Sequence, residues 1–384
     1  MKHRKFKVLI DDQIFRKQKI GGISNYFLYL LKEFEYISDF KVNNGVFLCK
    51  SEKFQAYGGE KFVRYNSRIW AIPAIFINFL KMLLIRPDII HSTFYSRWSF
   101  ALLSRRDHVV TIHDMIPEDY PDSFQQGNPN KFKSKYIRDA KGIIVVSQYT
   151  FERLMYHFPN LDCPISIIPL ASGFELNKTD NFDLERKFQE KSILFVGPRG
   201  GHKNFEILMN SLEKLIKIIP DISLTCIGGG IFNSFEVQSF EKLGIERHIR
   251  HLECNDEELR QQFLNCSLYI STSIAEGFGL PSIEAASMFT PVIVGQNSYL
   301  GRLLPDNFVI FDPFDEVELI KKIQNLLLDF NIYESSANSA YEKVQNLTWV
   351  DTANSTSNFY QFVLRNSARQ RPHSHFVQIN SFDW

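Results

Sequence analysis

Short apolar runs alternate with longer amphipathic segments along most of the 384 residues. This alternation predicts parallel strands covered by helices, because an amphipathic helix buries its apolar stripe against a sheet. In the first half we expect strands at Lys7–Asp11, Val46–Cys49, Ile89–His91, His108–His113, Gly142–Ser147 and Ser166–Pro169. In the second half we expect them at Ser192–Val196, Ser223–Ile227, Ile249–Leu252, Leu268–Ser271, Val292–Val294 and Val309–Phe311.

A polar interval separates the two series of strands. We therefore expect one Rossmann-like domain over residues 1–175, a linker over 176–190 and a second Rossmann-like domain over 191–350. Residues 351–366 are predicted to form a helix that returns to the first domain, and residues 367–384 a loosely ordered tail. The fold class is α/β, with two doubly wound domains facing each other across a cleft. Ligands of such sheets bind at the carboxyl ends of the strands.

Charge is balanced overall but unevenly distributed. Residues 1–180 hold 26 Lys and Arg against 18 Asp and Glu, an excess of eight positive charges, while the remainder is acidic. A basic half favours an anionic partner such as a phosphate-bearing molecule or a membrane surface, although an ordinary solvated surface explains it as well. The five Cys residues have no CxxC spacing, and no signal-peptide pattern precedes the first strand, so we expect reduced thiols in the cytoplasm.

One apolar stretch, Ile69–Ile85, reads IWAIPAIFINFLKMLLI. It is shorter than the roughly 20 residues that span a bilayer, and Pro73, Asn78 and Lys81 interrupt it. We expect a buried helix of the first domain; shallow contact with a membrane is the alternative.

The strongest chemical signal is Glu276-Gly277-Phe278-Gly279-Leu280-Pro-Ser-Ile-Glu284, shortly after a predicted strand. Two carboxylates flank a glycine-rich turn that opens a helix, whose N-terminal N–H groups favour an anion. Each carboxylate can accept hydrogen bonds from sugar hydroxyls. The alternative is a plain turn followed by a solvated glutamate.

A second signal, Gly197-Pro-Arg199-Gly-Gly-His-Lys203, also lies between a strand and a helix. Its glycines permit close approach of a ligand, and its two cations suit a diphosphate. It is not a P-loop, because GxxxxGK[ST] is absent. A plain basic turn is the alternative.

Two weaker signals lie in the first half. Gly21-Gly22 opens the first helix, where backbone N–H groups can meet a phosphate; an ordinary helix start capped by Ser24 is the alternative. His113, before Asp114, ends a strand and can point toward a ligand, although a lone histidine is more often structural.

Together these four motifs resemble the retaining glycosyltransferases of family 4, which have the GT-B fold. The resemblance runs from Gly21 to about Trp349, and Glu276 and Glu284 form its E-x7-E element. The phrases GGISNY, HSTFYS and TIHDMIPE look most like bacterial polysaccharide and O-antigen mannosyl- or rhamnosyltransferases. The turn from Arg199 to Lys203 is shorter than the family's common spacing, which leaves the phosphate contacts open.

The resemblance implies a role for each motif. Glu276 would contact the donor sugar and Glu284 the ribose, Arg199 and Lys203 would neutralise the diphosphate, Gly22 would offer its N–H to the phosphates, and His113 would lie beside the transferred sugar. The substrates implied are a nucleotide sugar, with a GDP-sugar and mannose favoured, and a glycan or lipid-linked glycan acceptor. Peripheral contact with the inner face of the membrane is an option, and no nucleic acid is expected.

No aspartate pair with DxD spacing ends a predicted strand, because Asp11-Asp12 lacks that spacing. We therefore expect no cofactor and no metal. The alternatives are a UDP- or dTDP-sugar transferase of the same fold, an inverting transferase or epimerase, and an inactive scaffold that binds a partner. A Rossmann oxidoreductase is disfavoured, because no GxGxxG follows the first strand.

Overall fold

The computed structural model describes residues 6–18, 21–37, 40–46, 48–51, 53–54, 63–64, 71–104, 106–124, 128, 130–177, 180, 182–304, 310–367 and 378–380. The chain forms two compact units. Unit 1 comprises Met1–Asp119, Gln126–Leu170 and Thr348–Trp384, and unit 2 comprises Tyr120–Gln125 and Ala171–Leu347.

Unit 1 is built on a parallel sheet of seven strands in the order β15-β8-β7-β6-β5-β1-β2. The strands are β1 (Phe6–Ile10), β2 (Phe40–Asn44), β5 (Ile89–Ser92), β6 (His108–Ile112), β7 (Gly142–Val145), β8 (Ile165–Ile167) and β15 (Gln378–Asn380). Strands β5, β6 and β7 are buried along their whole length, as expected for a parallel sheet covered on both faces. A separate two-stranded sheet joins β3 (Leu48–Cys49) to β4 (Val63–Arg64).

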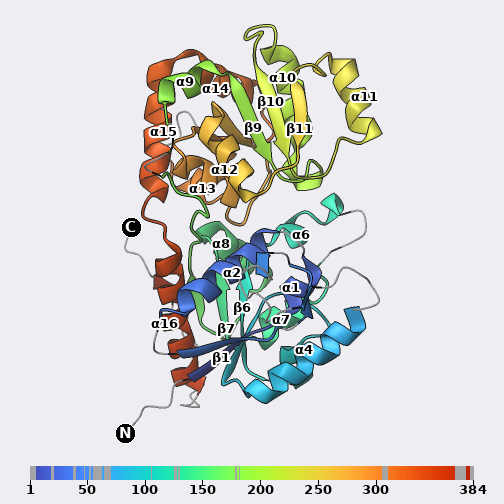
Figure 1. Ribbon diagram of the computed structural model, residues 1–384, viewed down its shortest axis with the longest axis vertical. Helices are drawn as coiled ribbons and strands as arrows, with labels where there is room; N and C mark the ends of the chain where they lie inside the picture. The colour runs from blue at the N-terminus through green and yellow to red at the C-terminus, as the bar shows by residue number, and fades with distance from the viewer. Residues whose placement is uncertain are drawn as a thin grey trace. The chain divides into compact units, whose positions relative to one another are not determined.

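Helices surround the unit 1 sheet (Figure 1). They are α1 (Gln13–Lys17), α2 (Gly22–Phe34), α4 (Ala71–Ile85), α5 (Phe100–Ser104), α6 (Ile116–Asp119), α7 (Lys133–Asp139), α8 (Gln148–His157) and α16 (Trp349–Ser367). The last helix, α16, packs against α2, where Trp349 stacks on Tyr29 with ring centroids 4.7 Å apart. Its Tyr360 hydroxyl lies 2.6 Å from Nδ1 of the buried His91, whose Nε2 lies 2.8 Å from Thr111 Oγ1.

Unit 2 contains a parallel sheet of six strands in the order β11-β10-β9-β12-β13-β14. The strands are β9 (Ser192–Val196), β10 (Ser223–Ile227), β11 (Ile249–Leu252), β12 (Leu268–Ser271), β13 (Val292–Gly295) and β14 (Ile310–Phe311). The helices are α9 (Leu184–Gln189), α10 (Phe205–Leu215), α11 (Ser234–Leu243), α12 (Asp256–Asn265), α13 (Leu280–Ser287), α14 (Glu316–Leu328) and α15 (Phe330–Val344). The strand order reverses between β9 and β12, and ligands bind at such a switch point in doubly wound sheets.

The structure departs from the sequence prediction in several segments. Strand β2 was not predicted, and helix α9 lies inside the interval expected to be a linker. The buried Lys187 fastens α9, because its ammonium donates to Thr290 Oγ1 at 2.6 Å and to the Met288 carbonyl at 3.0 Å. The expectation of a loosely ordered tail is wrong for Gln378–Asn380, since these residues pair with β8.

The helix predicted within Ile69–Ile85 is present as α4, but the expectation that it is buried is wrong for one face. Ala74, Asn78 and Met82 are buried, whereas Ile72 and Phe76 are exposed. Residues 69 and 70 lie outside the described residues. Among the helices that the structure describes, none combines the length and apolar character needed to cross a membrane.

The docking of α16 on the unit 1 sheet gives a testable prediction. A Cβ at Gly142 of β7 would lie 2.7 Å from Val363 Cγ2 and 2.9 Å from Phe359 Cζ, both on α16. Gly142→Ala should therefore lower the free energy of unfolding by about 1–3 kcal/mol, because the added methyl overpacks this contact. Urea unfolding followed by circular dichroism measures the change. Gly200→Ala is the matched control: a Cβ there meets no atom within 4 Å, so equal losses in both variants would contradict the packing.

Candidate functional site

An ion pair joins the loops that follow the two central strands of unit 2. The loop after β9 ends in a short 3-10 turn, Gly201–Lys203, and the loop after the neighbouring β12 carries Glu276. Lys203 Nζ lies 2.7 Å from Glu276 Oε1. Two hydrogen bonds hold the loops together: Thr272 Oγ1 donates to the Lys203 carbonyl and Ile274 N–H to the His202 carbonyl, each at 2.8 Å. The pair therefore sits at the topological switch point.

The Glu276 carboxylate is buried and only half satisfied. Besides Lys203, Oε1 accepts hydrogen bonds from Ser271 Oγ at 2.9 Å and Ser273 Oγ at 2.7 Å. Its other oxygen, Oε2, is buried without a hydrogen-bond partner in the part of the chain that the structure describes. Burial by itself raises the pKa of Glu276, but Lys203 and the two serine hydroxyls outweigh it and hold the pKa below its ordinary value. The group is thus a carboxylate with one buried oxygen whose capacity to accept a hydrogen bond is filled by no described residue.

The glycine-rich turn brings this oxygen to the start of a helix. Gly279 is the N-cap of α13 and has φ of 85°, a left-handed conformation that glycine adopts readily. A Cβ at Gly279 would lie 2.4 Å from Glu276 Oε2, so a larger residue would displace that carboxylate. Gly277 and Phe278 are buried, and the Phe278 ring packs on Tyr299 with centroids 4.4 Å apart. Leu280 is the first residue of α13.

The second glutamate of the motif lies on α13 itself. Glu284 is half-buried there. Burial raises the pKa of Tyr269 well above its ordinary value, and the charges of Glu276 and Glu284 raise it further. The charges of both carboxylates are thus felt by one buried side chain of β12.

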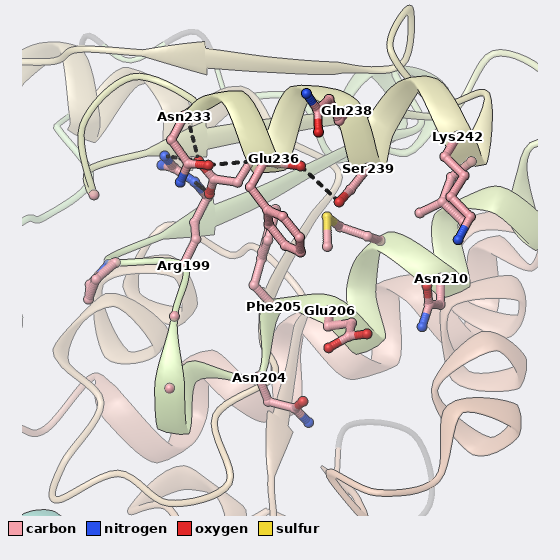
Figure 2. A pocket seen from close by; sticks show the side chains of 17 residues that line it. Arg199, Asn204, Phe205, Glu206, Asn210, Asn233, Glu236, Gln238, Ser239 and Lys242 are labelled. Carbon is pink, nitrogen blue, oxygen red and sulfur yellow. Dashed lines mark hydrogen bonds and ion pairs between the residues drawn. The ribbon is translucent and has the colours of Figure 1, made fainter. Parts of the chain in front are cut away.

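Arg199 binds a different set of groups from Lys203. Its Nε donates to Glu236 Oε1 at 2.6 Å, Nη1 to the Gly228 carbonyl at 2.7 Å and Nη2 to the Gly230 carbonyl at 2.8 Å. Figure 2 shows Arg199 reaching toward Glu236 of α11. Only 3% of its side chain is exposed. From the sequence we expected Arg199 and Lys203 to be two cations for one diphosphate. In the structure each guanidinium nitrogen of Arg199 already donates to an acceptor within the protein.

The turn that Arg199 holds consists of three glycines. Gly228, Gly229 and Gly230 have φ of 82°, 71° and 77°, a left-handed run that strongly favours glycine. Together with α10 and α11, this loop borders a groove of about 1020 Å³ in unit 2 (Figure 2). Neither Lys203 nor Glu276 lines the groove.

Two further predicted residues lie in unit 1. His113 follows β6, and its ring meets the Tyr26 ring of α2 edge-on, with centroids 5.2 Å apart. His113 Nε2 is buried without a hydrogen-bond partner among the described residues. Burial lowers the pKa of His113 to about 4, with Asp114 opposing and Lys133 adding to the shift, so the ring is neutral near pH 7.

Helix α2 begins at the predicted glycine pair but is not capped as expected. Gly21 is the N-cap and Gly22 the first helical residue, exposed at the helix end. Ser24 lies inside the first turn and donates its hydroxyl to the Gly21 carbonyl at 2.8 Å, so the alternative of a Ser24 cap is wrong. Gln18 accepts the Ser24 N–H instead, at 3.3 Å. The remaining N–H groups of this helix end suit an anion.

The carboxylates at the end of β1 are engaged in the protein. Asp11 accepts the Thr93 hydroxyl at 2.6 Å and the Gln13 amide at 2.6 Å, and Asp12 pairs with Arg16 at 2.6 Å. Burial and the neighbouring Asp12 raise the pKa of Asp11 to about 6. Among the described residues, no group of three or more His, Cys, Asp or Glu side chains is placed to hold a metal ion.

Comparison with known proteins identifies the family. The family model described as "Glycosyltransferase Family 4" matches residues 20–171, and the model described as "Glycosyl transferases group 1" matches residues 177–343. The chain belongs to glycosyltransferase family 4.

Relatives of this family 4 chain include two mannosyltransferases. The O-antigen chain mannosyltransferase RfbU of Salmonella typhimurium is 30% identical over 226 residues, which cover 58% of this chain and 61% of RfbU. The O-antigen chain mannosyltransferase B of Escherichia coli is 23% identical over 263 residues, which cover 66% of this chain and 67% of the relative. The chain thus matches about three fifths of RfbU.

Solved structures confirm the GT-B fold predicted from the sequence. HepE of Anabaena, solved in complex with UDP and glucose, has a TM-score of 0.71 at 17% identity, with 93% of this chain and 100% of HepE covered. Sucrose-phosphate synthase from Thermosynechococcus elongatus has a TM-score of 0.72 at 17% identity, with 94% and 100% covered.

Several residues of the family 4 site were not predicted. Ser271 and Ser273, which hold Glu276 Oε1, end β12 in the segment STS; hydroxyls at the carboxyl end of a central strand are the signal that could have identified them. Glu236 was not predicted either, because it reaches Arg199 only through the fold. The ligand roles assigned to the predicted residues all stay predictions: Gly21, Gly22, His113, Arg199, Lys203, Glu276, Gly277, Phe278, Gly279, Leu280 and Glu284.

Proposed function

We propose that this family 4 protein is a retaining glycosyltransferase that moves a hexose from a nucleotide sugar to a glycan or lipid-linked glycan in bacterial surface polysaccharide biosynthesis. One observation carries the proposal. Glu276 is a buried carboxylate whose Oε2 has no hydrogen-bond partner among the described residues, and it lies beside the N-terminus of α13 at the switch point of the sheet. A sugar hydroxyl is a donor of the right kind for that oxygen, and a phosphate is an anion of the right kind for the helix end.

Lys203 supplies the charge that the leaving group needs. An ammonium has three N–H donors, one of which goes to Glu276 Oε1 at 2.7 Å. The other donors of Lys203, together with the Leu280 N–H at the start of α13, are suited to a diphosphate that gains negative charge as the glycosidic bond breaks. Removing one preorganised donor of this type costs about 3–4 kcal/mol of transition-state stabilisation.

Transfer with retention needs no second carboxylate as a nucleophile. The bond from the anomeric carbon to the diphosphate oxygen breaks, the acceptor oxygen forms its bond on the same face, and the leaving phosphate takes the acceptor proton. Arg199 acts indirectly in this scheme. Its contacts with the Gly228 and Gly230 carbonyls hold the glycine turn against the loop that carries Lys203.

Similarity to RfbU favours mannose, carried by GDP-mannose, as the transferred sugar. A UDP- or dTDP-sugar is the second candidate, because HepE was solved with UDP and glucose. The positive excess of residues 1–180 suits an anionic acceptor such as a lipid-linked glycan at the inner face of the cytoplasmic membrane.

The test is donor turnover in the purified full-length protein. We expect hydrolysis of one nucleotide sugar among GDP-mannose, UDP-glucose and dTDP-rhamnose. Consumption of that donor should be faster when an acceptor glycan is added, because the sugar is then transferred to the glycan. Glu276→Gln and Lys203→Ala should each lower kcat by about 100- to 1000-fold, because each removes a group that acts on the reacting donor. Glu241→Gln and Lys217→Ala, at exposed positions of unit 2, are matched controls that should retain turnover. Binding of a nucleotide sugar with no turnover of any donor would instead indicate an inactive scaffold.

We also propose that transfer needs no metal or other cofactor. The carboxylates that end β1 are already hydrogen-bonded to Thr93, Gln13 and Arg16, so they are poorly placed to bind Mg²⁺ or Mn²⁺. Turnover should therefore be the same with and without EDTA. Loss of turnover in EDTA that added Mn²⁺ restores would contradict this proposal.

A further inference from the structure

The outer face of helix α4 is apolar, although the described residues of unit 1 leave it exposed. Figure 1 shows α4 on the outside of the unit 1 sheet. Five large apolar side chains lie on this face and are 43–85% exposed: Ile72, Phe76, Leu80, Leu83 and Leu84. At 100° per residue they fall within about 120° of the helix circumference, so they form one continuous stripe.

The polar residues of α4 lie on the opposite side and are used inside the protein. Asn78 is fully buried: its amide nitrogen donates to Asp12 Oδ2 at 2.7 Å and to the Leu48 carbonyl at 2.9 Å. Lys81 donates to the Val46 carbonyl and to Asn44 Oδ1 at 3.1 Å. A helix between protein and water has its polar residues outside. The reversed pattern of α4 indicates that its outer face is adapted to an apolar phase.

Basic groups gather at the carboxyl-terminal end of the stripe. Lys7 of β1 and Lys41 of β2 are register partners, and with Lys81, Leu84 and Ile85 they line a hollow of about 280 Å³. The exposed Arg86 follows α4 directly. In the sequence around the helix, residues 61–87 contain Lys61, Arg64, Arg68, Lys81 and Arg86 but no Asp or Glu. Cations beside an apolar stripe match the anionic headgroups and acyl chains of a lipid surface.

We propose that the outer face of α4, with Lys7 and Lys41 at its end, docks unit 1 on an anionic lipid bilayer. The helix is about 22 Å long, at 1.5 Å per residue, and about 10 Å wide. Its outer face therefore offers roughly 200–250 Å², well below the ~800 Å² per partner that a stable protein–protein interface buries. A second copy of the chain is thus a poorer occupant than a membrane, where a narrow stripe and a few cations together give reversible binding. The proposal does not depend on the transfer reaction.

Flotation of the full-length protein with vesicles tests the proposal, and no donor or acceptor is needed. We expect binding to phosphatidylcholine vesicles containing about 30 mol % phosphatidylglycerol, weaker binding to pure phosphatidylcholine, and a loss of binding between about 0.05 M and 0.5 M salt. Ile72→Ser/Phe76→Ser/Leu84→Ser should lower the partition coefficient by roughly tenfold or more. Each of these side chains is at least 63% exposed, so circular dichroism and melting temperature should not change.

Two further variants separate the contributions of the apolar stripe and of the lysines to vesicle binding. Phe314→Ser/Val317→Ser removes apolar side chains of unit 2 that are each 74% exposed, and it should bind vesicles like the wild type. Lys7→Gln/Lys41→Gln should weaken binding to anionic vesicles and leave binding to neutral ones unchanged. The proposal is overturned if the wild type does not bind anionic vesicles at low salt, or if the triple serine variant binds them as well as the wild type. It is also overturned if the protein binds no vesicles and light scattering shows a dimer that the triple serine variant abolishes. Because transfer is not measured, a failed transferase assay leaves this result intact.

Discussion

The Lys203–Glu276 ion pair is the interaction on which the unit 2 site depends. It joins the loops after β9 and β12, the two strands between which the sheet order reverses. Without the cation and the serine hydroxyls, burial would raise the pKa of this carboxylate. With them, its pKa stays low, and Oε2 is a buried acceptor without a described hydrogen-bond partner beside the N-terminus of α13. Charge, acceptor and helix end are thus fixed before a ligand arrives, which is what stabilisation of a leaving group requires.

Arg199 shows how a residue of a motif can make contacts that the composition of the motif does not indicate. A basic residue four positions from Lys203 reads as a second cation for the same anion. The structure instead uses its planar guanidinium as a fork that spans three main-chain and side-chain acceptors around Gly228, Gly230 and Glu236. That geometry suits arginine and not lysine, because lysine lacks the rigid fork of donors. In the structure Arg199 thus holds the glycine turn, whereas Lys203 pairs with Glu276.

The apolar pattern predicted most of the buried strands correctly, but it missed the features that depend on tertiary contacts. Strands β9 to β12 have the predicted bounds, because a buried parallel strand is a short apolar run between polar turns. Strand β2 reads FKVNN, which has too few apolar positions to signal a strand; its pairing with β1 supplies what its composition lacks. The E-x7-E carboxylates and Lys203 could be selected by residue type and spacing. Three other features depend on tertiary packing, which cannot be read from one sequence. They are the direction of the Arg199 side chain, the Gln18 contact that replaces the Ser24 cap, and the outward apolar face of α4.

The central claim is that Glu276 Oε2 receives a hydroxyl of the donor sugar, and calorimetric titration tests it most directly. The wild type and Glu276→Gln should be titrated with the nucleotide sugar that the protein turns over and with its nucleoside diphosphate alone. A hydrogen bond to a charged group is worth about 1.5–3 kcal/mol, so Glu276→Gln should weaken binding of the sugar nucleotide by about 10- to 100-fold. Its affinity for the nucleoside diphosphate should stay unchanged, since that ligand has no sugar to lose. Equal losses for both ligands, or no loss for either, would contradict the account.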